Sequence, residues 1–129
     1  MNYKSFIKII FNNSLVKGAS AHWWSQRLTA LCLIFFGTWF LVSLVMFESY
    51  QYIEIRVWIG HPLNSIMLIL LGLSLTYHSS LGLDVIIEDY IHQFSLREFC
   101  LSLNKITHFI LTFILIVALV VINLELFNG

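Results

Sequence analysis

Residues 63–92 read LNSIMLILLGLSLTYHSSLGLDVIIEDYIH and pass from an apolar run into a cluster of titratable groups. Residues 63–83 contain one histidine, His78, and no Asp, Glu, Lys or Arg. About 20 apolar residues are enough to cross the hydrocarbon core of a bilayer as a helix. If this helix continues, the pair Asp89-Tyr90 follows His78 by three turns, so that His78 and Asp89 point almost the same way, about 16 Å apart.

The composition of the whole chain agrees with a membrane protein. The 129 residues are 59% hydrophobic and 11% charged, with a mean hydropathy of +0.86. A soluble domain carries about 25% charged residues, so a water-facing globule is excluded. The length allows a single domain, 1–129. The formal net charge is zero, which argues against a nucleic-acid partner.

Two further runs have the length and composition of membrane spans. Neither contains Asp, Glu, Lys or Arg, and Trp23, Trp24 and Arg27 precede the first in the way that interfacial anchors do. The sequence therefore predicts an all-α membrane protein with three transmembrane helices, at 28–47, 63–83 and 106–124. The polar segments 48–61 and 84–104 are then expected to be the connections.

The basic residues predict the orientation of these helices. Six of the seven would lie on one side of the membrane, namely Lys4, Lys8, Lys17, Arg27, Arg97 and Lys105. Only Arg56 would lie on the other side. Because positive charge collects on the inner side, we expect the N-terminus inside, in the cytoplasm or an organelle's matrix. Residues 1–27 are expected to form an inner-face arm that lies on the membrane surface, rather than a cleaved presequence.

The second span carries two stripes of small and polar residues. One consists of Ser74, His78 and Gly82; the other repeats every seven residues, at Ser65, Gly72 and Ser79. Such stripes face protein rather than lipid. We expect the heptad stripe to pack within the chain's own bundle, and the His78 stripe to meet a cofactor or a second protein.

The histidine within the second span is the first candidate for chemistry. An ionisable side chain inside the membrane is costly, and imidazole is a good axial ligand of haem iron. Gly82, one turn further, would leave room for a flat macrocycle. His108 is a second histidine near the inner end of the third span. The alternative is that His78 only forms a hydrogen bond to a neighbouring helix, and the residues alone leave this open.

The Asp89-Tyr90 pair is the second candidate. A quinone needs a hydrogen-bond donor at its carbonyl oxygen and a proton source on reduction. A tyrosine beside a carboxylate can provide the donor and help with the proton. The alternative is an interfacial tyrosine next to a solvated acid. Arg27 and His22 lie at the same membrane face, where cations can meet carboxylates such as haem propionates. For Arg27 the alternative is a simple anchor.

Two motifs extend this interpretation. The stretch His22-Trp23-x-Ser25-x-Arg27 resembles the start of the first helix in the small membrane-anchor subunit family of succinate dehydrogenase, the cytochrome b small subunits. The pattern His78-x-x-x-Gly82, followed by Asp89-Tyr90, is similar to the second-helix signature of that family. The layout of three spans and their orientation also agree with it.

The resemblance implies a specific function. The chain would form half of a heterodimeric anchor bundle with a cytochrome b large anchor subunit, in the mitochondrial inner membrane or the bacterial cytoplasmic membrane. The pair would hold a flavoprotein with FAD and an iron–sulfur subunit, and would pass electrons from succinate to ubiquinone. The chain would not be catalytic alone. Two alternatives remain: the anchor of a quinol:fumarate reductase, or a purely structural or assembly subunit without haem.

The resemblance also implies roles for single residues. His78 would be an axial ligand of a haem b shared with the partner anchor. Tyr90 would form a hydrogen bond to a ubiquinone carbonyl oxygen, supported by Asp89. Arg27 and His22 would lie near the haem propionates.

Overall fold

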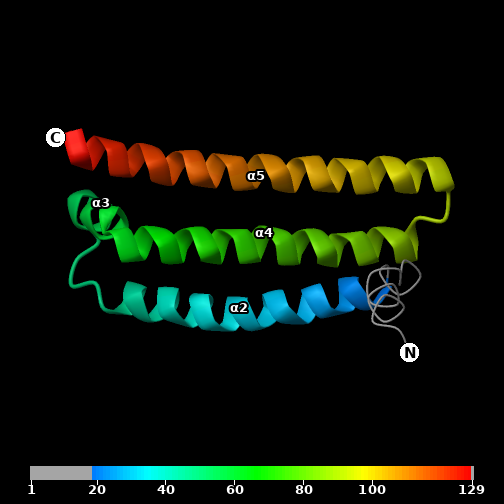
Figure 1. Cartoon of the computed structure of the whole chain (residues 1–129), viewed down its shortest axis with the longest axis horizontal. Coiled ribbons are helices and arrows are strands. Elements are labelled where there is room, and N and C mark those ends of the chain that lie inside the picture. The colour runs from blue at the N-terminus through cyan, green and yellow to red at the C-terminus, as the bar shows by residue number, and fades with distance from the viewer. Residues whose placement is uncertain (1–18, 129) are drawn as a thin grey trace, which may run out of the picture.

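The computed structural model describes residues 19–128, with side chains for 21–127. Within that range the chain is helical apart from short links, and Figure 1 shows its three long helices lying side by side. The helices are α2 (Ala19–Val45), α3 (Tyr52–Gly60), α4 (Pro62–Tyr90) and α5 (Phe94–Asn128). The first 18 residues of the predicted arm lie outside the described part.

The long helices α2, α4 and α5 are each long and apolar enough to cross a membrane. The chain is therefore an integral membrane protein with an all-α fold, as the sequence predicts. Each predicted span lies within one of these helices, except that residues 46–47 follow the end of α2. Of the three, α4 is the least hydrophobic, because it carries the polar stripes.

The predicted connections differ from the observed ones. The first, 48–61, contains the nine-residue helix α3. The second, 84–104, is almost entirely helical: α4 runs to Tyr90, α5 starts at Phe94, and only residues 91–93 link them. Polar side chains end an apolar span but not a helix, and this segment contains neither glycine nor proline to interrupt one.

Proline explains the break between α3 and α4. The residue before a proline is disfavoured in the helical region, and His61 adopts φ −67°, ψ 127° between α3 and α4. Pro62 then occupies the first turn of α4, where its missing N–H costs nothing. The chain therefore turns at His61, as the predicted start of the second span requires.

Helix α4 is the central element of the fold. It contacts α2 on one side and α5 on the other, while no Cα atoms of α2 and α5 come within 8 Å of each other in residues 19–128. The short helix α3 joins the far end of the bundle, through an ion pair between Arg56 and Glu125 of α5 and through stacking of Trp58 on Trp39 of α2, with ring centroids 5.6 Å apart. The result is a thin layer of three helices.

The heptad stripe of α4 packs on α5, as predicted. Ser65 exchanges hydrogen bonds with Asn123 of α5, whose Nδ2 lies 3.0 Å from Ser65 Oγ. Gly72 lies directly under Leu115. At the other end of this interface the buried Asn104 donates to the Ser80 carbonyl (2.9 Å) and to Asp84 Oδ1 (2.8 Å). Small residues and polar pairs thus hold this interface, as is usual in membranes.

Replacing Gly72 by leucine is expected to destabilise the α4–α5 interface. A Cβ at this position would overlap Leu115 Cδ2 and lie 3.3 Å from its Cγ, so a full leucine side chain must push the helices apart. Overpacking of this kind costs about 1–3 kcal/mol. Thermal unfolding in detergent, followed by circular dichroism, should show a lower midpoint. The double variant Gly72→Leu/Leu115→Ala should recover most of the loss; no recovery would contradict this contact.

Candidate functional site

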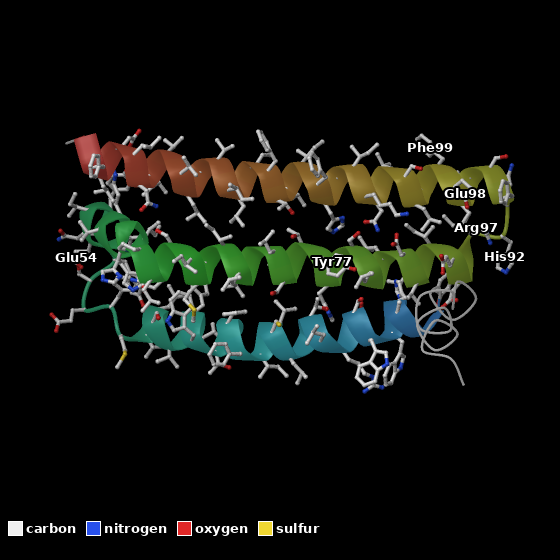
Figure 2. The ribbon with its side chains drawn as sticks, viewed as in Figure 1. Glu54, Tyr77, His92, Arg97, Glu98 and Phe99 are labelled. Carbon is white, nitrogen blue, oxygen red and sulfur yellow. The ribbon has the colours of Figure 1, made fainter. Side chains whose placement is uncertain are left out.

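One end of the bundle collects the residues that the sequence singled out. The antiparallel arrangement brings the start of α2, with His22 and Arg27, to the end of α4, with Asp89 and Tyr90 (Figure 1). Because α4 is one continuous helix from Pro62 to Tyr90, His78 and Asp89 are three turns apart on the same helix. The predicted clustering at a shared end is confirmed. Figure 2 shows that His92, Arg97 and Glu98 also lie at this end.

The ring of His78 contacts α2 through its Nδ1 atom. Nδ1 lies 2.9 Å from Thr29 Oγ1. The Thr29 hydroxyl also lies 2.8 Å from the Ser25 carbonyl oxygen, one turn earlier on α2. The Nε2 atom of His78 has no hydrogen-bond partner within the described range 21–127. One ring nitrogen is therefore held and the other is available.

The Ser74/His78/Gly82 stripe was expected to meet a cofactor or a second protein, but it lies against α2 of the same chain. Besides the contact between His78 and Thr29, a Cβ on Gly82 would lie 3.6 Å from Gln26 Nε2. Hydropathy alone does not reveal the direction in which α2 approaches α4. The Gln26 Oε1 atom is buried and lacks a hydrogen-bond partner among the described residues, so the side chain beside Gly82 has a free acceptor.

His108, the second histidine within the spans, has hydrogen-bond partners at both ring nitrogens. His108 Nδ1 lies 2.9 Å from the Asn104 carbonyl oxygen, and its Nε2 lies 3.2 Å from Ser79 Oγ. A carbonyl only accepts, so Nδ1 donates to it and Nε2 accepts from the Ser79 hydroxyl. Ser79 belongs to the α5-facing stripe of α4, away from His78. His108 is thus a structural side chain of the α4–α5 interface.

The Asp89-Tyr90 pair forms the last turn of α4 and points outward. Tyr90 is 80% exposed, and Asp89 is also exposed. The Tyr90 hydroxyl has no hydrogen-bond partner within the part of the chain that the structure describes; its carbonyl oxygen lies 3.2 Å from His92 Nδ1. Both side chains are therefore free to bind a group that approaches this end of the bundle.

The two predicted propionate neighbours lie on different faces of α2. The guanidinium of Arg27 lies over the ring of Trp23, 4.1 Å from its centroid, and Arg27 is exposed. His22 is half-buried and shares a face with Gln26 and Thr29, since it precedes them by four and seven residues. The structure does not bring Arg27 and His22 together.

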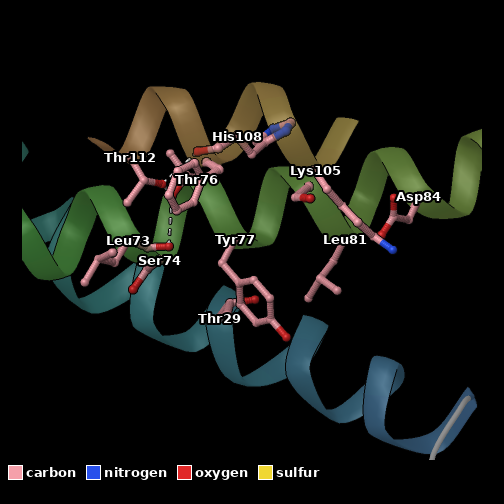
Figure 3. A pocket seen from close by; sticks show the side chains of 12 residues that line it. Thr29, Leu73, Ser74, Thr76, Tyr77, Leu81, Asp84, Lys105, His108 and Thr112 are labelled. Carbon is pink, nitrogen blue, oxygen red and sulfur yellow. Dashed lines mark hydrogen bonds between the residues drawn. The ribbon is translucent and has the colours of Figure 1, made fainter. Parts of the chain in front are cut away.

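A groove of about 760 Å³ opens beside α4 (Figure 3). Its walls come from all three long helices and include polar and charged side chains. These are Thr29 from α2; Ser74, Thr76, Tyr77, Ser80 and Asp84 from α4; and Lys105, His108 and Thr112 from α5. Charged groups such as Asp84 and Lys105 are costly against lipid, so this face needs cover from protein or water.

Comparison with known proteins decides the family. Residues 14–122 match the profile of the family described as "Succinate dehydrogenase/Fumarate reductase transmembrane subunit". The chain belongs to this family.

Named relatives agree with the assignment. The succinate dehydrogenase hydrophobic membrane anchor subunit of Rickettsia bellii is 34% identical over 88 residues, which are 67% of this chain and 70% of the relative. The corresponding subunit of Rickettsia prowazekii is 32% identical over 106 residues, covering 81% and 84%. That of Rickettsia conorii is 30% identical over 98 residues, covering 75% and 78%. The resemblance first seen in two short motifs is thus confirmed across most of the chain.

In this transmembrane subunit, the free ring nitrogen of His78 fits the requirement of a haem iron for an imidazole ligand. Axial ligation needs one imidazole with a free nitrogen, and His78 has one. The described residues contain no cluster of three His, Cys, Asp or Glu side chains that could hold a metal ion by themselves. The ligand that this chain would offer to a haem iron is then His78.

Sequence reasoning missed two residues of the site in this transmembrane subunit. Thr29 and Gln26 lie beside His78 and Gly82, yet they belong to another helix. The available signal was that Gln26 and Thr29 continue the helical face that starts at His22. The partner of that face could not be identified without the register between α2 and α4.

Proposed function

We propose that this succinate dehydrogenase membrane anchor binds a haem b together with a second anchor subunit, and completes a ubiquinone-reduction site. The two anchors would hold the flavoprotein and iron–sulfur subunits on the inner membrane face. One observation carries the proposal: α4 presents a histidine with one free ring nitrogen inside the membrane and an exposed Asp-Tyr pair at the membrane edge.

His78 would be the residue of this chain that holds the haem, through Nε2. Contact with Thr29 holds the ring, and the packing of α2 on α4 at Gly82 keeps the site away from lipid. A bound haem b would supply one-electron redox chemistry at this depth. Both ring nitrogens of His108 have partners, Asn104 and Ser79, so a second ligand would come from the partner anchor.

Tyr90 and Asp89 act on the quinone. The Tyr90 hydroxyl is exposed and without a partner in the described chain, so it can donate a hydrogen bond to a quinone carbonyl oxygen. Asp89, its neighbour in the last turn, accepts and returns protons at the edge of the membrane, where water reaches it. Reduction of a quinone consumes two protons, so a donor and a proton source must lie together.

Arg27 and His22 remain the proposed neighbours of the haem propionates. His22 lies on the face of α2 that continues toward Thr29. Arg27 would reach a propionate from outside the α2–α4 interface, where it stacks on Trp23. A guanidinium binds carboxylates in a bidentate manner; an imidazole offers a single donor at a time.

The small number of buried residues supports the proposal that a second anchor subunit packs against this chain. Among the described residues only Ser65, Leu81, Asn104 and Leu119 are buried. The groove beside α4 is lined by Asp84, Lys105 and other polar groups. A layer of three helices with a polar groove is an incomplete bundle, and helices from another subunit would cover it.

The orientation follows from charge. Arg27 near the start of α2, and Arg97 and Lys105 in the first part of α5, belong to the end of the bundle where α4 finishes with Asp89 and Tyr90. The other end holds Arg56, which is paired with Glu125. By the positive-inside rule the first end faces the matrix or the cytoplasm. The quinone site would then lie on the side where a soluble iron–sulfur partner delivers electrons.

The alternative of a quinol:fumarate reductase uses the same parts in the opposite direction. The family description covers both enzymes, whereas the named relatives are succinate dehydrogenase anchors. We therefore favour succinate oxidation. A purely structural subunit would not require a free Nε2 at His78 or an exposed pair at Tyr90.

Purification of the assembled complex tests the proposed function. An affinity tag on this chain, with membranes solubilised in mild detergent, should retain two large soluble subunits with FAD and iron–sulfur clusters, a second three-helix anchor, and a b-type optical spectrum. The complex should reduce a soluble ubiquinone analogue with succinate faster than it reduces fumarate with quinol. A chain that purifies without a flavoprotein, or without haem, would contradict the corresponding part of the proposal.

A further inference from the structure

The hydroxyl of Thr29 is surrounded by three polar atoms. Its Oγ1 lies 2.8 Å from the Ser25 carbonyl oxygen, 3.1 Å from the Gln26 carbonyl oxygen and 2.9 Å from His78 Nδ1. A threonine hydroxyl has one proton to donate and two lone pairs to accept. Carbonyl oxygens cannot donate. With its proton directed to the nearest carbonyl, that of Ser25, Oγ1 accepts a hydrogen bond from the ring of His78.

This arrangement selects one tautomer of His78. When Nδ1 carries the proton, Nε2 keeps its lone pair in the plane of the ring, as iron ligation requires. Histidines that bind metals usually donate their other N–H to an acceptor, which fixes the tautomer and the ring orientation and raises the basicity of the ligand. Among side chains of the described residues, Thr29 is the acceptor that His78 has.

His108 provides an internal comparison. It has the same tautomer, since its Nδ1 donates to the Asn104 carbonyl oxygen, but its Nε2 accepts from the Ser79 hydroxyl. The chain thus satisfies both nitrogens of one intramembrane histidine and only one of the other. A histidine that served helix packing alone would resemble His108.

We propose that Thr29 is a positioning residue for His78: its hydroxyl accepts from His78 Nδ1–H, holds the ring and directs Nε2 to the iron of the haem. This inference rests on the proposed haem ligation by His78. Thr29 itself contacts neither the haem iron nor the quinone. It acts by raising the electron density on the ligand, which favours the ferric state and lowers the haem midpoint potential.

The test compares Thr29→Val with a matched control, Thr112→Val, in the purified complex. Thr112 also bonds the carbonyl four residues earlier, that of His108 (2.9 Å), and a side chain across the interface, Thr76 Oγ1 (3.0 Å). It differs in that its hydroxyl has no hydrogen bond to a histidine ring. Both substitutions remove one hydroxyl from an interhelical hydrogen bond, so a general loss of packing affects both alike.

Two readouts that do not depend on turnover are measured. One is the rate at which haem passes from the oxidised complex to apomyoglobin; the other is the midpoint potential in an optical redox titration. Thr29→Val should weaken haem binding by about 10–100-fold, as loss of an outer-shell partner commonly does, and should raise the potential. Thr29→Ser keeps the hydroxyl and should behave like the wild type, and Thr112→Val should too.

The outcomes separate this inference from the function on which it rests. Wild-type haem retention and potential in Thr29→Val, or equal changes in Thr29→Val and Thr112→Val, overturn the positioning role and leave His78 as a ligand. A wild-type complex without haem overturns both. Thr29→Ala, which removes the hydroxyl without adding bulk, is measured in parallel, so that poor assembly of the valine variant still leaves a decisive result.

Discussion

Replacing His78 by leucine is expected to abolish the low-spin, six-coordinate b-type spectrum of the purified complex. Leucine cannot bind iron, so a haem retained by the partner anchor alone would be five-coordinate at most. The ligand also anchors the haem, and even the loss of an outer-shell partner weakens metal binding by about 10–100-fold. Haem content per flavin should therefore fall as well. Optical and electron paramagnetic resonance spectra at equal flavin concentration measure both effects.

The matched control for this variant is His108→Gln. His108 lies in a neighbouring helix of the same membrane bundle, but its ring bonds Asn104 and Ser79, and a glutamine amide can replace part of that bonding. Its spectrum should remain six-coordinate. An unchanged spectrum and haem content in His78→Leu would rule out His78 as the ligand. Loss of the spectrum in both variants would indicate a general effect on assembly.

Replacing Tyr90 by phenylalanine is expected to lower quinone reduction while succinate oxidation with an artificial acceptor continues. The substitution removes only the hydroxyl, which has no partner in the described part of the chain, and it leaves the backbone contact between His92 and the Tyr90 carbonyl intact. Loss of a hydrogen bond to a group that becomes charged costs about 1.5–3 kcal/mol, which corresponds to about a 10–100-fold lower rate. Paired assays on one preparation give the ratio.

Tyr77→Phe is the corresponding control. Tyr77 is also on α4 and half-exposed, at 52%, but it lies 13 positions earlier, part-way along the helix (Figure 2). Both activities should remain at the wild-type level in this variant. Equal loss of quinone reduction and dye reduction in Tyr90→Phe would assign Tyr90 to assembly instead of the quinone site.

Much of the fold could be predicted from the sequence, because a membrane imposes strong rules. Only helices or closed barrels satisfy their backbone hydrogen bonds in lipid, so three long apolar runs predict three helices. The ends were harder to predict. Residues 84–104 are polar and were expected to be a connection, yet all but 91–93 are helical. Hydropathy indicates where lipid ends, which need not be where a helix ends: Pro62 marks the start of α4, but no proline or glycine marks the link at 91–93.

The candidate site was also predictable in part. His78, Asp89 and Tyr90 lie on one helix, so their relative positions follow from the helical repeat alone. That His22 and Arg27 share an end with them follows from the antiparallel order of adjacent spans. By contrast, Arg27 and His22 do not lie together as a pair, because they are five positions apart and therefore on different faces of α2.

Helical periodicity determined which side chains within 63–92 share a stripe, and topology determined which ends of the spans meet. Only the tertiary structure decided what each stripe touches. The Thr29–His78 contact joins residues 49 positions apart, and it depends on the rotation and axial register of α2 against α4. Several rotations would bury similar apolar area in lipid, so the choice rests on small residues and a few polar pairs. These hydrogen-bonded pairs, which hydropathy does not reveal, leave one ring nitrogen of His78 free and neither ring nitrogen of His108 free.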